Sequence, residues 1–310
     1  MPLVKESDIL RHAIEHHYAV PGLFAFNYEF IKVIIDVCEE EHCPVVLCQG
    51  PEFIKKNGEV IFTKACIEAA RDAKVPVALA VDHSFVTNEN SIPEQIHNIA
   101  LGWNSVMIDG SLLSYEDNVK ISKKLAYICK GAGVSSCAAL GEVRRFFPQA
   151  MNYDKHKPFD DSFTVPEEIM TDPKLVKDFT ERTGISTLAI SIGQYVRSLW
   201  DGEKPPFKKT GHLDFDRLAA IRKETDTPLI LHGATHVCEE DLEKAAVSGV
   251  AMIKVASEQA IMWANELRSF LEENPSVMFP EDIQKSALLA VKESMRHFIR
   301  LFHANNQIDY

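Results

Sequence analysis

The sequence lacks an excess of basic residues, a C-x-x-C pair and any long apolar run. Its 310 residues carry 33 Lys and Arg against 45 Asp and Glu, which gives a formal net charge of −12. Nucleic-acid phosphates need a basic face, so we expect no nucleic-acid partner. No apolar stretch approaches the roughly 18 residues that span a bilayer, so we expect no membrane segment. The opening residues MPLVKESDIL do not pair a basic start with an apolar stretch, which predicts no signal peptide.

The cysteines are odd in number and scattered, which argues against a disulfide framework. The chain has seven of them, Cys38, Cys43, Cys48, Cys66, Cys129, Cys137 and Cys238. This pattern is typical of a reduced cytoplasmic protein whose thiols are mostly buried and inert. We interpret Cys137, which stands among small apolar residues, as core filling rather than as a reactive thiol.

Short apolar runs alternate with longer amphipathic segments along most of the chain. Eight of the runs are continuous in Val, Ile, Leu or Ala, as in parallel strands that are buried on both faces. These predicted strands are 22–27, 44–49, 77–82, 105–108, 134–140, 187–192, 229–232 and 252–255. The predicted helices between them are 30–41, 62–73, 91–101, 114–132, 173–183, 214–224 and 239–248.

Strand–helix alternation indicates crossover connections and a parallel sheet. Eight such strands within about 260 residues predict an α/β fold of the TIM (β/α)8-barrel type, a single domain over residues 1–310 whose last ~50 residues are a helical extension. A doubly wound open sheet is the alternative, but no G-x-G-x-x-G follows the first strand. The long polar segment 142–172 is predicted to be a functional loop, and the extension to break near residues 274–280.

Three predicted strands end in residues that can carry chemistry, and in a barrel of this kind the site lies at those ends. Asp82 and His83 follow the third strand, where a proton-transfer group can stand beside a metal ligand. His232 ends the seventh, before small residues whose N–H groups can face an anion. Asp109 ends the fourth, before a glycine that allows a tight turn. Taken singly, each motif also has a purely structural explanation. The aspartate of the first could cap the next helix, a histidine could be hydrogen-bonded within its loop, and Asp109 with its glycine could be a simple turn.

Taken together and in order, these motifs resemble the class II, metal-dependent fructose-bisphosphate and tagatose-bisphosphate aldolase family. Residues 76–83 (PVALAVDH) are similar to its PVALHLDHG stretch, and residues 102–111 (GWNSVMIDGS) to its GFTSVMIDGS. Residues 18–20, 26–27, 213–215 and 229–235 match its opening strand, its LDF and its LVLHGGSG. The resemblance implies a TIM barrel, homodimers or tetramers, zinc held by His83 and His232, and Asp82 as general acid and base. Zinc would act as a Lewis acid on a ketose.

The chain departs from the family pattern at several points that matter for function. The family's third zinc-binding histidine aligns with Val196 or Arg197, and neither is a normal zinc ligand. A replacement ligand would have to come from Glu142, Gln194 or His236. The EAELG of the fifth strand becomes CAALG, the KxNIxTD of the last becomes KVASEQA, and Arg144 and Arg145 replace loop glycines. Residues expected to bind substrate are Asn27, Asp109, Arg144, Arg145, Arg197, Gly233 and Thr235.

These observations favour a divergent class II aldolase-like carbon–carbon lyase, an aldehyde-lyase that acts on a sugar-like ketose or a related acid. Zinc or another divalent metal is the expected cofactor, and Asp82 the general acid and base. Arginines at the mouth suit an anionic small molecule because they hydrogen-bond planar anions in a bidentate way. One alternative is a catalytically impaired homologue that binds a small anionic ligand or a partner enzyme. Another is a metal-free enzyme in which Arg197 replaces zinc as the electrophile.

Overall fold

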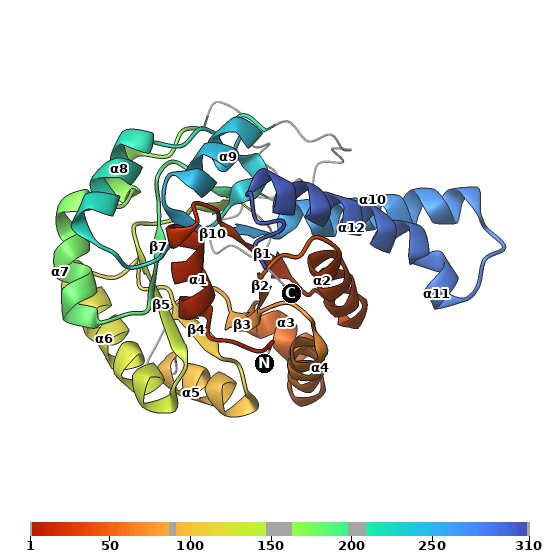
Figure 1. The fold of residues 1–310 in the computed structure, drawn as a ribbon, viewed down its shortest axis with the longest axis horizontal. Helices are drawn as coiled ribbons and strands as arrows, with labels where there is room; N and C mark the ends of the chain where they lie inside the picture. Colours follow the sequence, from red (N-terminus) through yellow and green to blue (C-terminus); the bar gives the residue numbers. More distant parts are fainter. Residues whose placement is uncertain (1, 87–90, 147–162, 198–208, 309–310) are drawn as a thin grey trace.

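Eight parallel strands form a closed barrel at the centre of the molecule (Figure 1). A computed structural model describes residues 2–86, 91–146, 163–197 and 209–308. Every barrel strand is fully buried, which explains why its sequence is continuously apolar rather than alternating. Around the ring the order is β1 (Val20–Phe24), β10 (Val250–Val255), β9 (Leu229–Leu231), β7 (Thr187–Ile190), β5 (Ser135–Leu140), β4 (Ser105–Ile108), β3 (Val77–Val81) and β2 (Val45–Gln49).

The ring closes where β1 pairs with β10, with Gly22 opposite Lys254. Each predicted strand is present, so the TIM-barrel prediction is confirmed and the open sheet is excluded. Boundaries shift by a few residues. The first strand begins at Val20. It ends at Phe24, before the predicted end, because Asn27 accepts a hydrogen bond from Phe30 N at 3.1 Å and so starts the next helix.

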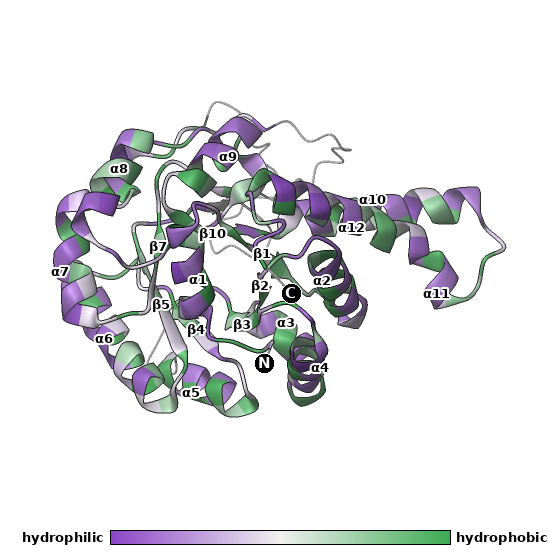
Figure 2. Cartoon of the chain, in the orientation of Figure 1, coloured by the Kyte–Doolittle hydropathy of each residue, from purple (hydrophilic) through white to green (hydrophobic). Residues whose placement is uncertain are grey.

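The helices between the strands surround the barrel and carry hydrophobic and hydrophilic residues on different faces (Figure 2). All seven predicted helices are present, and α5 and α7 have the predicted bounds. One further short helix, α3, was not predicted, which makes eight helices among the described residues of this part of the chain. They are α2 (Tyr28–Glu40), α3 (Pro51–Lys56), α4 (Glu59–Asp72), α5 (Ser91–Leu101), α6 (Tyr115–Ala132), α7 (Pro173–Thr183), α8 (Phe215–Glu224) and α9 (Glu239–Val247).

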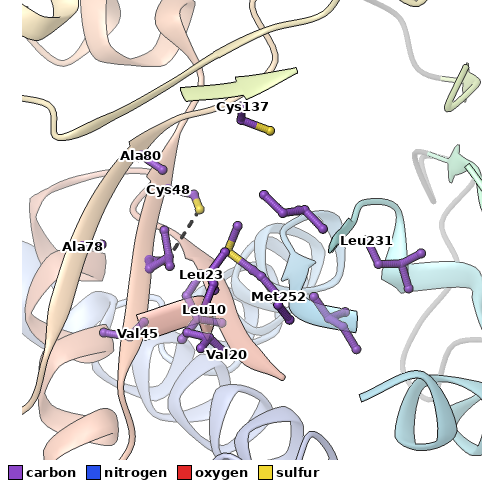
Figure 3. Packing of buried hydrophobic residues seen from close by; sticks show 14 of the residues in the cluster. Leu10, Val20, Leu23, Val45, Cys48, Ala78, Ala80, Cys137, Leu231 and Met252 are labelled. Carbon is purple, nitrogen blue, oxygen red and sulfur yellow. Dashed lines mark hydrogen bonds between the residues drawn. The ribbon is translucent and has the colours of Figure 1, made fainter. Parts of the chain in front are cut away.

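A helix that the sequence pattern did not reveal, α1 (Glu6–Glu15), closes the end of the barrel where the strands begin. Ser7 N donates to Ser135 Oγ at 3.1 Å, and Thr187 Oγ1 donates to Glu6 Oε1 at 3.2 Å, so α1 contacts the first residues of β5 and β7. Leu10 of α1 belongs to the buried core and lies among side chains of the strands (Figure 3). The closed end therefore leaves the opposite end for a functional site.

The loops after β5 and β7 meet in a small parallel sheet of β6 (Arg145–Phe146) and β8 (Val196–Arg197). Val196 N donates to Arg144 O at 2.7 Å. Within its described part, the predicted functional loop 142–172 thus contains a strand, and a short 3-10 helix at Glu167–Ile169 follows. Residues 147–162 lie outside the described part of the chain. The pairing draws two distant segments together beyond the strand ends.

The C-terminal extension is helical and projects from the barrel (Figure 1). It comprises α10 (Ser257–Glu273), α11 (Pro280–Ile283) and α12 (Lys285–Leu301), with the break near residues 274–280 that the sequence predicts. Buried Glu41, just after α2, accepts hydrogen bonds from Arg296 Nε at 3.0 Å and from Arg300 Nη2 at 2.8 Å. This pairing of one carboxylate with two guanidinium groups holds α12 against α2.

Among the described residues, none of the helices combines the length and the apolar character that crossing a membrane requires.

We expect Phe298→Ala to lower the free energy of unfolding by about 3–5 kcal/mol, because truncating a fully buried aromatic ring leaves a cavity. Leu289→Ala on the same helix is the matched control. Leu289 is 59% exposed, so its truncation should cost no more than about 0.5 kcal/mol. Urea unfolding followed by circular dichroism measures both. Equal losses in the two variants would contradict the described packing of α12.

Candidate active site

Four ionisable side chains from three strands converge inside the open end of the barrel. Asp82 and His83 follow β3, His232 follows β9, and Lys254 lies on β10. His232 Nδ1 is 3.7 Å from Asp82 Oδ1, and His83 Nε2 is 3.9 Å from Asp82 Oδ2. The two imidazole rings are tilted relative to each other, with centroids 4.0 Å apart and an angle of 58° between their planes. The structure thus brings together the residues that the three strand ends singled out.

Lys254 is the residue of this group to which the sequence analysis assigned no function. Its Nζ contacts Asp82 Oδ1, and both side chains are almost fully buried. Space for the lysine comes from Gly22 on the neighbouring strand, because a Cβ there would lie 2.8 Å from Lys254 Cγ. The signal in the sequence is a single lysine inside an otherwise apolar strand, together with a glycine inside another.

Charge around Asp82 keeps its carboxyl group ionised. Burial alone would raise the pKa of Asp82, but positive charge at His83, Lys254 and His232 outweighs burial and holds the pKa well below its usual range. Burial likewise opposes charge on Lys254, but Asp82, followed by Cys48, Cys137 and Glu6, raises the lysine pKa above its usual value. The pair is therefore an ammonium and a carboxylate at neutral pH.

Asp109 orients His83 from the side away from Asp82. His83 Nδ1 lies 3.3 Å from Asp109 Oδ2, and the other oxygen of Asp109 accepts bonds from Ser111 N at 3.1 Å and Ser111 Oγ at 2.6 Å. A carboxylate can only accept, so Nδ1 carries the proton of this bond, and Nε2 faces Asp82. His83 also has a φ of +35°, a left-handed conformation that non-glycine residues rarely adopt and that often marks functional sites.

The donor set of Asp82, His83 and His232 fits a divalent metal ion. One atom from each lies within 4.8 Å of one from each of the others. Two imidazole nitrogens and a carboxylate oxygen are donors that zinc and related divalent metals accept. The bond from His83 to Asp109 is the kind of support that ligating histidines usually receive from a carboxylate. Metal-ligand functions for His83 and His232 stay predictions, and Asp82, the expected general acid and base, lies beside them.

Glu142 and His236, two of the three expected replacement ligands, are not part of this donor group. Gln194 is engaged by its own turn: its Oε1 accepts from Ile192 N at 2.8 Å and its Nε2 donates to Ile190 O at 2.6 Å. Glu142 pairs with Arg144 at 3.3 Å. Buried His236 stacks on the Tyr195 ring, with centroids 5.4 Å apart. A ligand function for Glu142 or His236 stays a prediction, and the contacts of Gln194 favour a structural function instead.

The expected substrate-binding residues lie at the strand ends, but several serve the local fold. Asn27 caps α2 through the bond from Phe30 N. Gly233 has a φ of +74°, and a Cβ there would lie 2.8 Å from Tyr195 O, so this turn requires glycine. Thr235 is buried in the following 3-10 helix, Ala234–His236. Arg145 and Arg197 are described by their backbones alone, so their side chains lie outside the described part of the structure. Substrate contacts for all of these stay predictions.

A family of known sequences and several solved structures are similar to this chain. The sequence model of the family described as "Fructose-bisphosphate aldolase class-II" matches residues 4–307. The chain belongs to that family. The YdjI aldolase from Escherichia coli K12 is similar to this chain, with 25% identity and a TM-score of 0.77. The similarity covers 99% of this chain and 100% of the YdjI chain. The fructose-bisphosphate aldolase of Campylobacter jejuni shares the fold over 99% of this chain and 97% of that one, with 17% identity and a TM-score of 0.77.

Family membership bears on the metal. Class II aldolases are typically metal-dependent, and this member keeps an Asp, His, His group in the barrel.

Cys137, on β5 inside the core, is buried, and burial raises its pKa to about 12. This agrees with its interpretation as core filling, because a buried thiol of high pKa is a poor nucleophile.

Removing the charge of Lys254 should leave a buried, uncompensated carboxylate. We expect Lys254→Met to lower the free energy of unfolding by about 3–5 kcal/mol at neutral pH. The control is Lys32→Met, which breaks an exposed pair with Asp36 and should cost no more than about 0.5 kcal/mol. Chemical denaturation of both variants, each compared with the natural protein, is the measurement. A Lys254 variant as stable as the Lys32 variant would show that the buried pair does not balance the charge of Asp82.

Proposed function

We propose that this aldolase-family protein is a metal-dependent aldehyde-lyase that cleaves a carbon–carbon bond in a sugar-like ketose or a related acid. The observation that supports the proposal is the convergence of Asp82, His83 and His232 at the open end of the barrel. Barrel packing by itself does not need an Asp–His pair at one strand end and a histidine at another. Family membership makes lyase activity the expected use of such a group.

In this proposal, His83 and His232 would hold a divalent metal, with Asp82 beside them. When bound, the metal supplies Lewis acidity toward the ketose carbonyl. Asp82 is the base: its carboxylate accepts the proton of the substrate hydroxyl as the neighbouring carbon–carbon bond breaks, and it returns a proton in the condensation direction. Lys254 keeps that carboxylate ionised and in place before substrate arrives.

The charges at the mouth favour a substrate without two phosphate groups. Glu258, in the first turn of α10, stands where the family motif differs from this chain, and it pairs with Lys209 at 3.2 Å. Lys209 also pairs with Glu239 at 2.9 Å, so this cation is already neutralised by two carboxylates of the chain. A phosphate there would meet like charge. A carboxylated or non-phosphorylated sugar-like compound fits better, because Arg144 near the mouth is likewise paired, with Glu142 at 3.3 Å.

Three further expectations belong to this proposal. The enzyme works as a homodimer or tetramer, as the family resemblance implies. Its substrate is a small molecule and not a nucleic acid or a membrane. It is cytoplasmic, which agrees with seven cysteines that are all free and six of which are buried. The single-domain organisation over residues 1–310 likewise stays a prediction.

No contact among the described residues favours the non-catalytic alternative over the enzyme, because the acid, the two imidazoles and the orienting Asp109 are together. The metal-free alternative depends on Arg197, whose side chain lies outside the described part of the structure. Chelation distinguishes it from the proposal.

The decisive experiment is a retro-aldol screen over phosphorylated, carboxylated and neutral ketoses, with aldehyde release as the measurement. Cleavage by the natural protein should fall by about 10²–10⁴-fold in Asp82→Asn, because a positioned acid–base group contributes that much. Asp36→Asn, an exposed carboxylate of helix α2, is the matched control and should keep full activity. Exhaustive chelation should abolish cleavage, and zinc should restore it. Cleavage that survives chelation would support the metal-free alternative, and no cleavage across the panel would count against a lyase.

The affinity for metal tests the function of Asp109 independently of catalytic activity. We expect Asp109→Asn to weaken metal binding by about 10–100-fold, the usual effect of removing a carboxylate that supports a ligating histidine. Competition with a chromophoric chelator measures the affinity, again with Asp36→Asn as the control. An unchanged affinity in Asp109→Asn would mean that His83 needs no support from Asp109.

A further inference from the structure

A second group of metal-binding side chains lies outside the barrel interior, on two loops beyond the strand ends. His212 precedes α8, Cys238 is the residue before α9, and Asp241 lies in the first turn of α9. Cys238 Sγ is 3.4 Å from His212 Nδ1, and Asp241 Oδ2 is 3.2 Å from the same nitrogen. One atom from each residue lies within 4.8 Å of one from each of the others. The proposed reaction uses none of the three.

The spacing of these atoms fits tetrahedral coordination. For Zn–S near 2.3 Å and Zn–N and Zn–O near 2.1 Å, a tetrahedral angle places sulfur and nitrogen roughly 3.6 Å apart, and nitrogen and oxygen roughly 3.4 Å apart. The observed distances, 3.4 and 3.2 Å, are each about 0.2 Å shorter than these. A small outward movement of each side chain would admit the ion.

The backbone holds the three side chains in register independently of their own contacts. Gly211 and Val237 form a parallel bridge, in which Gly211 N donates to His236 O at 2.8 Å and Cys238 N donates to Gly211 O at 2.9 Å. Leu213 N donates to Asp241 Oδ2 at 2.8 Å. The loops approach so closely that a Cβ at Gly211 would lie 3.0 Å from His236 O. A site built in this way loses little conformational freedom when it binds an ion.

Exposure and composition also distinguish this group. Cys238 is partly exposed, whereas the other six cysteines are buried. The His212 side chain is 77% exposed and that of Asp241 19%, so solvent reaches the group and can supply a fourth ligand. A thiolate and a carboxylate together balance a divalent charge. Thiolate with imidazole favours zinc or a metal of similar softness over magnesium or calcium.

We propose that His212, Cys238 and Asp241 form a second divalent-metal site of zinc type, with three protein ligands and a water molecule, separate from Asp82, His83 and His232. An ion bound there would connect the loop before α8 to the start of α9, and so brace two of the loops at the open end of the barrel. The proposal does not depend on the reaction, because a group of thiolate, imidazole and carboxylate binds zinc whatever the barrel catalyses.

The experiment measures the rate at which Cys238 reacts with an aromatic disulfide in the full-length, metal-free protein, without and with zinc. Cys238 is the one thiol that is partly exposed, so it should react in the native state before the six buried thiols, and Cys238→Ser should abolish that reaction. Zinc should slow it by about tenfold or more, because a metal-bound thiolate is no longer a free nucleophile. Cobalt should give the near-ultraviolet absorption of a sulfur-to-metal transition, which the barrel group cannot produce because it contains no thiol.

Matched variants assign the remaining ligands. Asp241→Asn keeps an acceptor for Leu213 N but should weaken zinc protection by about tenfold or more, since losing a ligand costs at least as much as losing its support. Glu240→Gln, the exposed neighbour on the same turn, should change nothing. His83→Ala should leave the protection of Cys238 intact, so failure of the barrel site and failure of this site are distinguishable. A thiol that reacts at the same rate with and without excess zinc, and gives no cobalt absorption, would overturn the proposal.

Discussion

The ion pair between Lys254 and Asp82 is the interaction on which the open end of this barrel depends. A carboxylate buried among apolar strands would be protonated without a compensating charge, and a protonated Asp82 could neither accept a proton nor sit beside a cation. Lys254 supplies the charge from inside the barrel, and Gly22 leaves room for its stem. Glu6, from the helix that closes the other end, is fully buried; burial raises the pKa of its carboxyl group, and the nearby Lys254 lowers it. Ionisable groups thus enter the barrel interior from both ends.

The other parts of the site build outward from that pair. Parallel strands in a ring place all their carboxyl ends at one rim, so Asp82, His83 and His232 meet although they are far apart in sequence. Asp109, at the next strand end, fixes the ring of His83. Where the family's third histidine is missing, the chain instead forms the β6–β8 pairing, and Gln194 is bound to its own backbone. The structure therefore brings the acid and two imidazoles together at the strand ends, and several departures from the family sequence pattern lie in the surrounding loops.

Much of the fold could be predicted because buried parallel strands leave a strong pattern. The eight apolar runs, the amphipathic helices between them and the break in the C-terminal extension all carry local signals. Helix α1 was not predicted because it precedes the first strand, outside the strand–helix alternation. Helix α3 was not predicted because a six-residue helix is too short to show a helical period in the sequence. Lys254 escaped for another reason: a lysine in a strand has no assigned partner until the ring closes.

The sequence by itself determined the fold class, the family resemblance and the identity of the three barrel residues at the strand ends, since each depends on local composition and order. Only the tertiary structure decided which side chains touch. It placed Lys254 beside Asp82, bonded Gln194 to its own turn, and brought His212 together with Cys238 and Asp241, which follow it by 26 and 29 residues in the chain. The reason is physical: burial, charge compensation and metal coordination depend on distances through space, and those distances exist only after strands far apart in sequence have paired.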